Sequence, residues 1–446
     1  MLTGLCLVWL IAVLFIFGYT PTNDGVGYVE LARQCLSEGE PYPTTTIYGQ
    51  EPFVWNIGII CLTELSLLVS GSLVPLLLLL CVLKAATALF MALTARQLLS
   101  ERAALMALVL FIVYPNNWGQ STMVSSEIPS TCLSMAAVWV VSRAYRANGK
   151  YGANGAYGAN GADGTYGAYA PYLVAGLLLG LANWFRPTAT IFLLSILVFL
   201  AFQGRRTLWR GGVGLLSGYV LFVAVAGTSC YVRTGHFVYQ ARSYWFSMVD
   251  ECYDDAAVAP HWGQPVWPEG TPRYIAPEER RSMDCFDYER LWRQRSLDWL
   301  KDHPLKYLSK VPGRLYYMYQ SDYDNLPAFI ENKSKPENNY ITLPYRHLLS
   351  EADSLSHAQW LAVVCMICYV ALLLMAIAGT ILQLHQGHWQ RLLLPLSVVV
   401  GGSLLLVLVM HGETRFKDPL MPFWLMLATL SLNHLSKKPS LCRMNE

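Results

Sequence analysis

Long apolar runs separated by short charged segments constrain this chain more than any other feature. The run from Met1 to Gly18 contains no charged residue, and several later runs approach or exceed about 18 residues, the usual length of a transmembrane candidate. Only 14% of the 446 residues are charged, against roughly 25% in soluble proteins. The pattern predicts an all-α polytopic membrane protein. A net charge of +2 with no basic, aromatic-rich block argues against a nucleic-acid partner.

Basic residues beside the apolar runs set the predicted topology, because Lys and Arg gather on the cytoplasmic side of membrane proteins. All basic clusters fall on one side if Phe53–Ser70 lies along the outer surface, which its Glu64 also favours. We therefore expect a bundle of about ten spans with both termini cytoplasmic. The clusters are Arg96/Arg102, Arg143/Arg146/Lys150, Arg205/Arg206/Arg210, Arg391 and Lys437/Lys438. The expected spans are 2–19, 73–98, 103–120, 124–145, 172–185, 187–203, 212–231, 359–383, 392–410 and 418–436.

Three parts follow from this topology. We expect an N-terminal transmembrane catalytic module at 1–231, an extracytoplasmic loop at 232–358, and C-terminal transmembrane helices with a short tail at 359–446. The first part contains a juxtamembrane outer loop at 20–72 and a cytoplasmic linker at 146–171, whose Gly/Ala/Asn/Tyr repeat is of low complexity. In the large loop, Pro277–Asp302 has a helix-like pattern, and Leu305–Tyr319 resembles an interfacial amphipathic helix.

Eleven cysteines raise the question of disulfides and metals. Cys365 and Cys368 have the CxxC spacing but lie in the middle of an expected span, where thiols behave as small hydrophobes. Cys252 and Cys285 share the large loop, and two interpretations stand: one disulfide in an oxidising compartment, or two free thiols.

Two acids lie at predicted membrane boundaries. Asp24 follows the first apolar run, and Glu127 lies beside Pro115 and Trp118. Both are expected on the outer side, together with Arg186, which lies within the helix break at Asn183–Pro187. Asp24 has two interpretations, a general base or the N-cap of a helix over Val26–Leu36. Glu127 likewise either orients an acceptor or a metal, or begins a helix over Ile128–Val141.

Four segments, in order, resemble motifs of the GT-C superfamily of membrane glycosyltransferases, nearest to the protein O-mannosyltransferases and the lipid A aminoarabinose transferase. The likeness covers most of the chain outside the linker. The matching segments are Asn23-Asp24-Gly-Val-Gly-Tyr28-Val-Glu-Leu31-Ala32, the stretch from Val113-Tyr-Pro115 to Ser125-Ser-Glu127, Gly180-Leu-Ala-Asn-Trp-Phe-Arg186-Pro187, and Arg415-Phe-Lys-Asp-Pro419-Leu-Met-Pro422.

The resemblance implies a polyprenyl-phosphate-linked sugar donor and transfer to an acceptor hydroxyl on glycan, lipid or protein, at the outer face of a bacterial plasma membrane. Asp24 would be the general base of a single, inverting displacement. Arg186 and Arg415 have two interpretations: they bind the donor phosphate through bidentate contacts, or they snorkel or form ion pairs, Arg415 with Glu413. Tyr28 and Glu413 are weaker candidates for contacts to the acceptor or the sugar.

Metal use stays open. Many relatives carry two adjacent acids in the first loop, whereas here Asn23 precedes Asp24. No cofactor is therefore assigned, and a divalent cation is neither required nor excluded by the sequence.

Two other functions compete with this one. An O-antigen polymerase or ligase would use a diphosphate-linked oligosaccharide, and the acid in the first loop argues against it. A transporter or flippase of lipid-linked sugars would show inverted repeats and charges near the bilayer midplane. The sequence has no visible internal repeat of that kind, and Lys84 is the one clear charge deep within an expected span.

Overall fold

The computed structural model describes residues 1–39, 55–147, 169–252, 269, 274–280, 282–283, 285–333, 341–344, 352–410 and 412–435. Every regular element in these ranges is a helix, so the all-α prediction is confirmed. The repeat within the predicted linker and the basic pair Lys437/Lys438 lie outside the described residues.

Each of the ten expected spans coincides with a helix or a broken helix. The matching helices are α1 (Leu2–Phe17), α4 (Val74–Leu98), α5 (Glu101–Val113), α7 (Glu127–Ala147), α8 (Ala170–Phe185), α9 (Ala189–Phe202), α10 (Arg205–Thr234), α16 (His357–His385), the α17–α18 rod (Trp389–Val409) and α19 (Met421–Leu435).

The number of full-length spans is smaller than expected. Within the described residues four helices are long and apolar enough to cross a bilayer, or five if Asn116–Thr122 and α7 form one bent span. The difference has a simple cause, because crossing needs about 20 residues while α1, α8 and α9 have 16, 16 and 14. Proline and turn residues shorten these helices, as at Arg186-Pro187 between α8 and α9.

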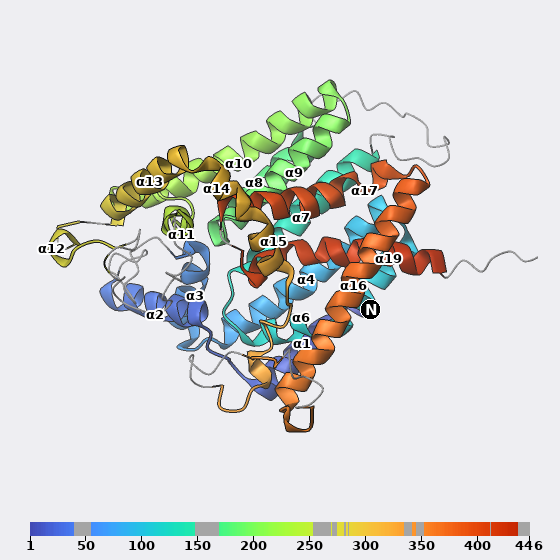
Figure 1. The fold of residues 1–446 in the computed structure, drawn as a ribbon, viewed down its shortest axis with the longest axis horizontal. Coiled ribbons are helices and arrows are strands. Elements are labelled where there is room, and N and C mark those ends of the chain that lie inside the picture. Colours follow the sequence, from blue (N-terminus) through green and yellow to red (C-terminus); the bar gives the residue numbers. More distant parts are fainter. Residues whose placement is uncertain are drawn as a thin grey trace, which may run out of the picture.

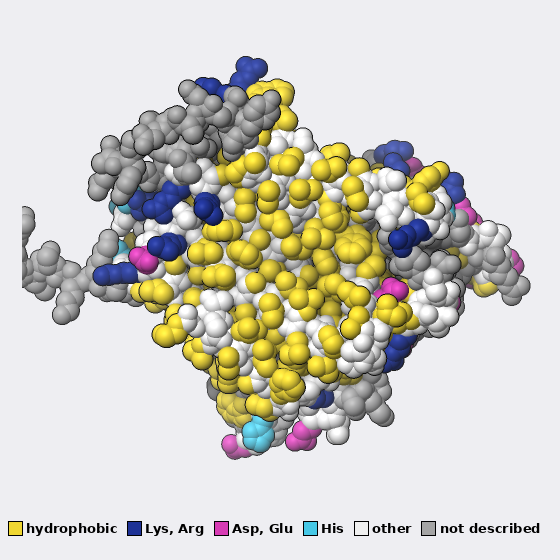
Figure 2. Space-filling model, turned by 180° about the vertical axis from the view of Figure 1, so that it is seen from behind, with side chains coloured by type: hydrophobic (Ala, Val, Ile, Leu, Met, Phe, Trp, Pro, Cys, Tyr) yellow, Lys and Arg dark blue, Asp and Glu magenta, His cyan; other side chains and the backbone are white. Residues whose placement is uncertain are grey.

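The helices share one extended hydrophobic core. Buried residues of α1, α4, α5, α7, α8, α9, α16 and α19 belong to a single cluster, and in Figure 1 the helices form one body with α16 and α19 at one edge and α8 to α10 at the other. Gly218 of α10 permits one close contact, because an added Cβ there would lie 2.1 Å from the Leu173 carbonyl oxygen of α8. Figure 2 shows a continuous apolar face with basic side chains at its margins, as expected of a membrane protein.

Three of the basic clusters lie at the same end of the bundle. Arg96 pairs with Glu101 at 3.6 Å. Arg146 Nη1 donates to Gln97 Oε1 at 3.2 Å, and Tyr145 Oη donates to Gln203 Oε1 at 2.5 Å, beside the Arg205 cluster. The prediction that the basic clusters share one side of the membrane therefore corresponds to their position at one end of the helix bundle. Its assignment to the cytoplasm stays a prediction.

The other end carries α2 (Asn23–Glu38), α3 (Ile57–Ser70) and the helices of the large loop. Ile57 of α3 packs with Cys230 and Val238, at the end of α10 and just beyond it. The predicted patterns in the large loop are helices: α12 (Pro277–Arg280), α13 (Cys285–Asp302), α14 (Pro304–Ser309) and α15 (Val311–Tyr319). They follow α11 (Tyr244–Glu251).

The thiol of Cys252 is free and buried. Cys252 therefore forms no disulfide in this structure. The side chain of Cys285, its predicted partner in one of the two interpretations, lies outside the described residues. Burial is the main cause that raises the pKa of Cys252, to about 11, so this thiol stays protonated near neutral pH.

Candidate active site

Asp24, the first of the two predicted catalytic acids, lies in the first turn of α2. Thr22 is the N-cap residue, and its hydroxyl accepts a hydrogen bond from the Gly25 amide at 3.3 Å. The prediction that Asp24 itself caps this helix is therefore wrong, and its carboxylate is free for another contact. Gly25 allows α2 to approach the second motif closely, because a Cβ there would lie 2.9 Å from the Val124 carbonyl oxygen. Asp24 thus has a fixed position beside the chain that leads to Glu127.

Arg415 reaches Asp24 from the other end of the chain. It lies on η6 (Thr414–Leu420), a short 3₁₀ segment before α19. Its Nη1 forms an ion pair with Asp24 Oδ2, and its Nε lies 2.5 Å from Glu413 Oε2. The Arg415 and Asp24 side chains are 38% and 32% exposed. A charged group in solution or at the membrane surface can therefore reach this pair, which we call the outer pair.

A second arginine–carboxylate pair lies deeper. Arg186, between α8 and α9, places Nη1 2.6 Å from Glu127 Oε1, and these side chains are only 8% and 12% exposed. Glu127 Oε2 also accepts hydrogen bonds from Ser125 Oγ at 2.8 Å and Ser126 Oγ at 3.2 Å. We call Arg186–Glu127 the inner pair. Its charges compensate one another away from water, as a buried ion pair requires.

A bend in the chain brings Glu127 to this place. After α5, the segment Asn116–Thr122 turns back and meets α7 at an angle of 119°. Glu127 is the first residue of α7, so the prediction that it begins this helix holds. A first-turn carboxylate lies where the helix dipole favours negative charge.

Phe416 joins the two pairs. Its ring is buried, with the Arg186 guanidinium 5.8 Å and the Arg415 guanidinium 6.0 Å from its centroid. Cation–π attraction at such distances helps to orient both arginines. The four predicted site charges therefore form one cluster built from four separate segments of the chain.

A hydrogen-bonded chain of uncharged residues supports the inner pair. Tyr28 Oη lies 3.3 Å from Ser126 Oγ, and Asn56 Nδ2 donates to both, at 2.8 and 3.1 Å. Ser126 Oγ in turn accepts from Arg186 Nη1 at 3.2 Å. Tyr28 was predicted to contact a ligand, but here it is fully buried and contacts protein groups. Asn56 and Ser126 were not predicted as site residues, since a lone amide and a serine carry little signal in sequence.

The electrostatics keep these groups in defined protonation states. Burial, with further contributions from Asp24 and Glu127, raises the pKa of Tyr28 well above its usual value, so its hydroxyl remains a donor. For Arg415, burial opposes the charge, but Asp24, Glu413 and Glu127 outweigh it and raise the pKa of the guanidinium. Arg415 is permanently cationic.

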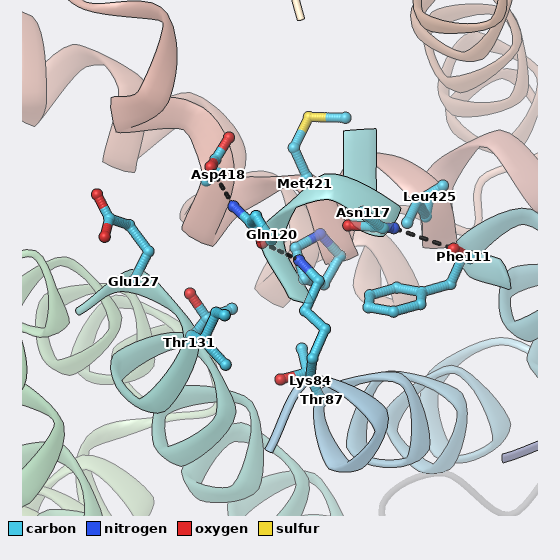
Figure 3. A pocket seen from close by; sticks show the side chains of 12 residues that line it. Lys84, Thr87, Phe111, Asn117, Gln120, Glu127, Thr131, Asp418, Met421 and Leu425 are labelled. Atoms are coloured by element: carbon cyan, nitrogen blue, oxygen red, sulfur yellow. Dashed lines mark hydrogen bonds between the residues drawn. The ribbon is translucent and has the colours of Figure 1, made fainter. Parts of the chain in front are cut away.

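A small cavity lies beside Glu127 (Figure 3). Its volume of about 20 Å³ is room for about one water molecule. Lys84 of α4 lines it and donates to Gln120 Oε1, and Gln120 Nε2 donates to Asp418 Oδ2 at 2.6 Å. Glu127 also lines the cavity. Asp418 was not predicted as a site residue.

The carboxylates here do not make a metal site. Among the described residues no group of three His, Cys, Asp or Glu side chains is arranged to hold a metal ion. Asp24 and Glu127 are each already paired with a guanidinium. The residues present therefore do not fit a divalent cation in this arrangement, and no chemical step is assigned to one.

Comparison with solved structures identifies the fold. The oligosaccharyltransferase of Archaeoglobus fulgidus, in complex with zinc and sulfate, matches with a TM-score of 0.52 at 12% identity, over 98% of this chain and 49% of that one. The same enzyme tethered to an acceptor peptide containing the NVT sequon matches with a TM-score of 0.51 at 13% identity, over 97% and 49%. This chain thus spans about half the length of that enzyme.

A third structure, ArnT from Cupriavidus metallidurans bound to undecaprenyl phosphate, matches at 13% identity with a TM-score of 0.40, over 97% of this chain and 77% of that one. No protein-family model and no curated protein sequence matches the chain. The chain shares the fold of the archaeal oligosaccharyltransferase, which is the kind of helical membrane fold that the four motifs led us to expect.

Proposed function

We propose that this protein is an integral membrane glycosyltransferase that moves a sugar from a polyprenyl-phosphate donor to an acceptor hydroxyl. The observation that carries the proposal is the outer pair: Asp24 and Arg415, 391 residues apart, are in direct contact beside the inner pair. This places a carboxylate able to act as a base against a permanent cation able to bind phosphate. The GT-C fold supports the same class of reaction.

The proposed reaction is a single displacement with inversion. The acceptor hydroxyl oxygen attacks the anomeric carbon while Asp24 takes the hydroxyl proton. The bond from the anomeric carbon to the phosphate oxygen breaks, and polyprenyl phosphate leaves with the electron pair. Arg415 stabilises the negative charge on the leaving phosphate. The donor phosphate must first compete with Asp24 for Arg415, so donor binding also releases the base.

The inner pair has a different proposed role. Arg186 is too buried to serve as the first phosphate contact, and its guanidinium is already engaged by Glu127 and Ser126. We assign the pair to shaping the site, with Glu127 oriented to contact the acceptor once Arg186 neutralises its charge. Glu413 holds the Arg415 side chain in place through Nε.

The surroundings suit a lipid-borne substrate. The outer pair lies at the end of the bundle opposite the basic clusters, and the predicted topology places that end outside the plasma membrane of a bacterium. Leu305, Leu308, Tyr316 and Tyr317 are exposed on α14 and α15 near this end, as an interfacial helix pair would require. The acceptor, whether glycan, lipid or protein, and the three-part division at 231 and 358 remain part of the proposal.

The decisive experiment compares two acid-to-amide variants on the same helix. Asp24→Asn should lower turnover with polyprenyl-phosphate sugar by about 10²- to 10⁴-fold, the usual contribution of a general base. Glu38→Gln, at the exposed end of α2, should leave turnover unchanged. Both variants should elute as folded protein in detergent. Wild-type turnover by Asp24→Asn would remove Asp24 from the mechanism.

The same purified protein separates the rival functions. Mass spectrometry of copurifying lipid should find a polyprenyl monophosphate. Turnover only with diphosphate-linked oligosaccharide would instead favour a polymerase or ligase. Movement of the lipid-linked sugar across vesicles without transfer would favour a transporter.

A further inference from the structure

The segment η6 presents consecutive residues to two different environments. Arg415 and Phe416 belong to the candidate active site, whereas Lys417 and Asp418 contact polar groups of the interior. Lys417 is fully buried, with a side-chain exposure of 0%. A buried ammonium two residues from Arg415 has no part in the proposed reaction and calls for an explanation.

The ammonium of Lys417 has a full set of partners. It lies 2.9 Å from Asp322 Oδ1, and it donates to the Ser321 carbonyl oxygen at 2.6 Å and to the Thr414 carbonyl oxygen at 2.8 Å. The three partners match the three donors of a lysine. The Thr414 contact is notable because it bridges across Arg415 within η6. Lys417 therefore fixes the backbone of η6 on both sides of Arg415.

Asp322 attaches this segment to the rest of the bundle. Its carboxylate is 1% exposed, and its Oδ2 accepts a hydrogen bond from Tyr114, at the end of α5. Its carbonyl oxygen accepts from Cys365 Sγ of α16 at 3.0 Å. One residue, Asp322, thus ties η6 to two helices of the apolar core, through its carboxylate to Tyr114 and through its backbone carbonyl to α16.

A second polar anchor acts on the next residue of η6. Asp418 Oδ2 accepts hydrogen bonds from Gln120 Nε2 at 2.6 Å and from Asn325 Nδ2 at 3.1 Å. The backbone amide of Asn325 also donates a hydrogen bond to the side-chain oxygen of Asn116 at 3.0 Å. The bend that carries Glu127 and the segment that carries Arg415 are therefore held by one continuous network, part of which is visible in Figure 3.

A buried ion pair contributes little net stability, because the desolvation of two charges offsets their attraction. Replacing both charges of a buried pair with apolar residues of similar volume is often neutral for folding. We propose that Lys417 and Asp322 are positioning residues that hold Arg415 at the distance from Asp24 where it binds the donor phosphate. This inference rests on the phosphate role proposed for Arg415.

The test separates positioning from stability. In Lys417→Met alone, the Asp322 carboxylate is left buried without its cation, and the melting temperature in detergent should fall by several degrees. The double variant Lys417→Met/Asp322→Leu removes both charges and should recover most of that loss. Its KM for polyprenyl-phosphate sugar should nevertheless stay raised by about tenfold, because a displaced binding group loses its geometry. The acceptor KM should not change.

Two further variants complete the test. Arg415→Ala should raise the donor KM, and adding the double substitution to it should raise the donor KM no further, because the network acts through Arg415. Gly379→Ala is the matched control: its Cβ would lie 2.7 Å from the Ser431 amide of α19, so it should lower the melting temperature without altering the donor KM.

The outcomes are distinguishable. A raised donor KM in Arg415→Ala with a normal value in the double variant overturns the positioning role and leaves the proposed function intact. Full additivity in the triple variant also overturns it. An unchanged donor KM in Arg415→Ala itself overturns the phosphate role, and the inference falls with it.

Discussion

The outer and inner pairs contain the same chemistry in different surroundings. Each is an arginine bound to a carboxylate, yet the outer pair is about one-third exposed and the inner pair about one-tenth. An ion pair near water is worth only about 0–1 kcal/mol. Removing one partner of a buried pair costs about 3–5 kcal/mol. The outer pair can therefore open for a ligand, while the inner pair has to remain closed for the site to keep its shape.

Glu127→Gln should break the inner pair and give the largest effect on stability. Arg186 would be left buried without a counter-charge, at a cost of about 3–5 kcal/mol. Asp24→Asn should cost less than about 1 kcal/mol. Thermal unfolding of both variants in detergent measures the contrast. Equal losses of stability would show that the two pairs are not distinct.

Arg415→Lys tests whether the outer pair binds donor phosphate through its charge alone or through the planar guanidinium. Lysine keeps the charge but loses the planar fork that binds phosphate through two hydrogen bonds, so the donor KM should rise by about tenfold with little change in folding. Steady-state kinetics with varied donor concentration provide the measurement. A donor KM equal to that of the wild type would indicate that charge alone suffices.

Asn56→Ala should disturb the inner pair indirectly. Its amide donates to Tyr28 and Ser126, and losing these hydrogen bonds should cost about 1–3 kcal/mol. Turnover at saturating donor should fall modestly while the donor KM stays the same. A change confined to the donor KM would place Asn56 beside the outer pair instead.

Salt should affect the two pairs differently and give the smallest effect. Raising the ionic strength from about 0.01 to 0.15 M shortens the Debye length from about 30 to 8 Å, so attraction of donor phosphate to Arg415 should weaken by a few fold. The inner pair is shielded from solvent, and the melting temperature should hardly move. A titration with sodium chloride, read by donor KM and by melting, tests both expectations.

Much of this arrangement was visible in the sequence. The apolar runs located every expected helix, and the positions of Asp24, Glu127, Arg186 and Arg415 at run boundaries predicted their convergence. The pairing of each acid with a particular arginine was not predictable, apart from the contact of Arg415 with Glu413. Pairing depends on the bend before α7 and on the turn of η6, and neither leaves a periodic signal.

The interior network was missed for a related reason. The sequence analysis assigned no role to Lys417 or Asp322, because nothing local marks a lysine as buried when its counter-charge is 95 residues away. Lys84 was noticed only as a charge within an apolar run. Burial of single charges is a property of the packed fold, which composition and spacing do not encode.

The contact between Asp24 and Arg415 also has a consequence for biosynthesis. At about 5–20 residues per second, roughly 20 to 80 seconds separate the emergence of the two residues from the ribosome. Until η6 is inserted, the growing chain carries a carboxylate without its cation and has no complete site. If the proposed function holds, a nascent or truncated chain in the membrane would therefore be unable to consume lipid-linked sugar.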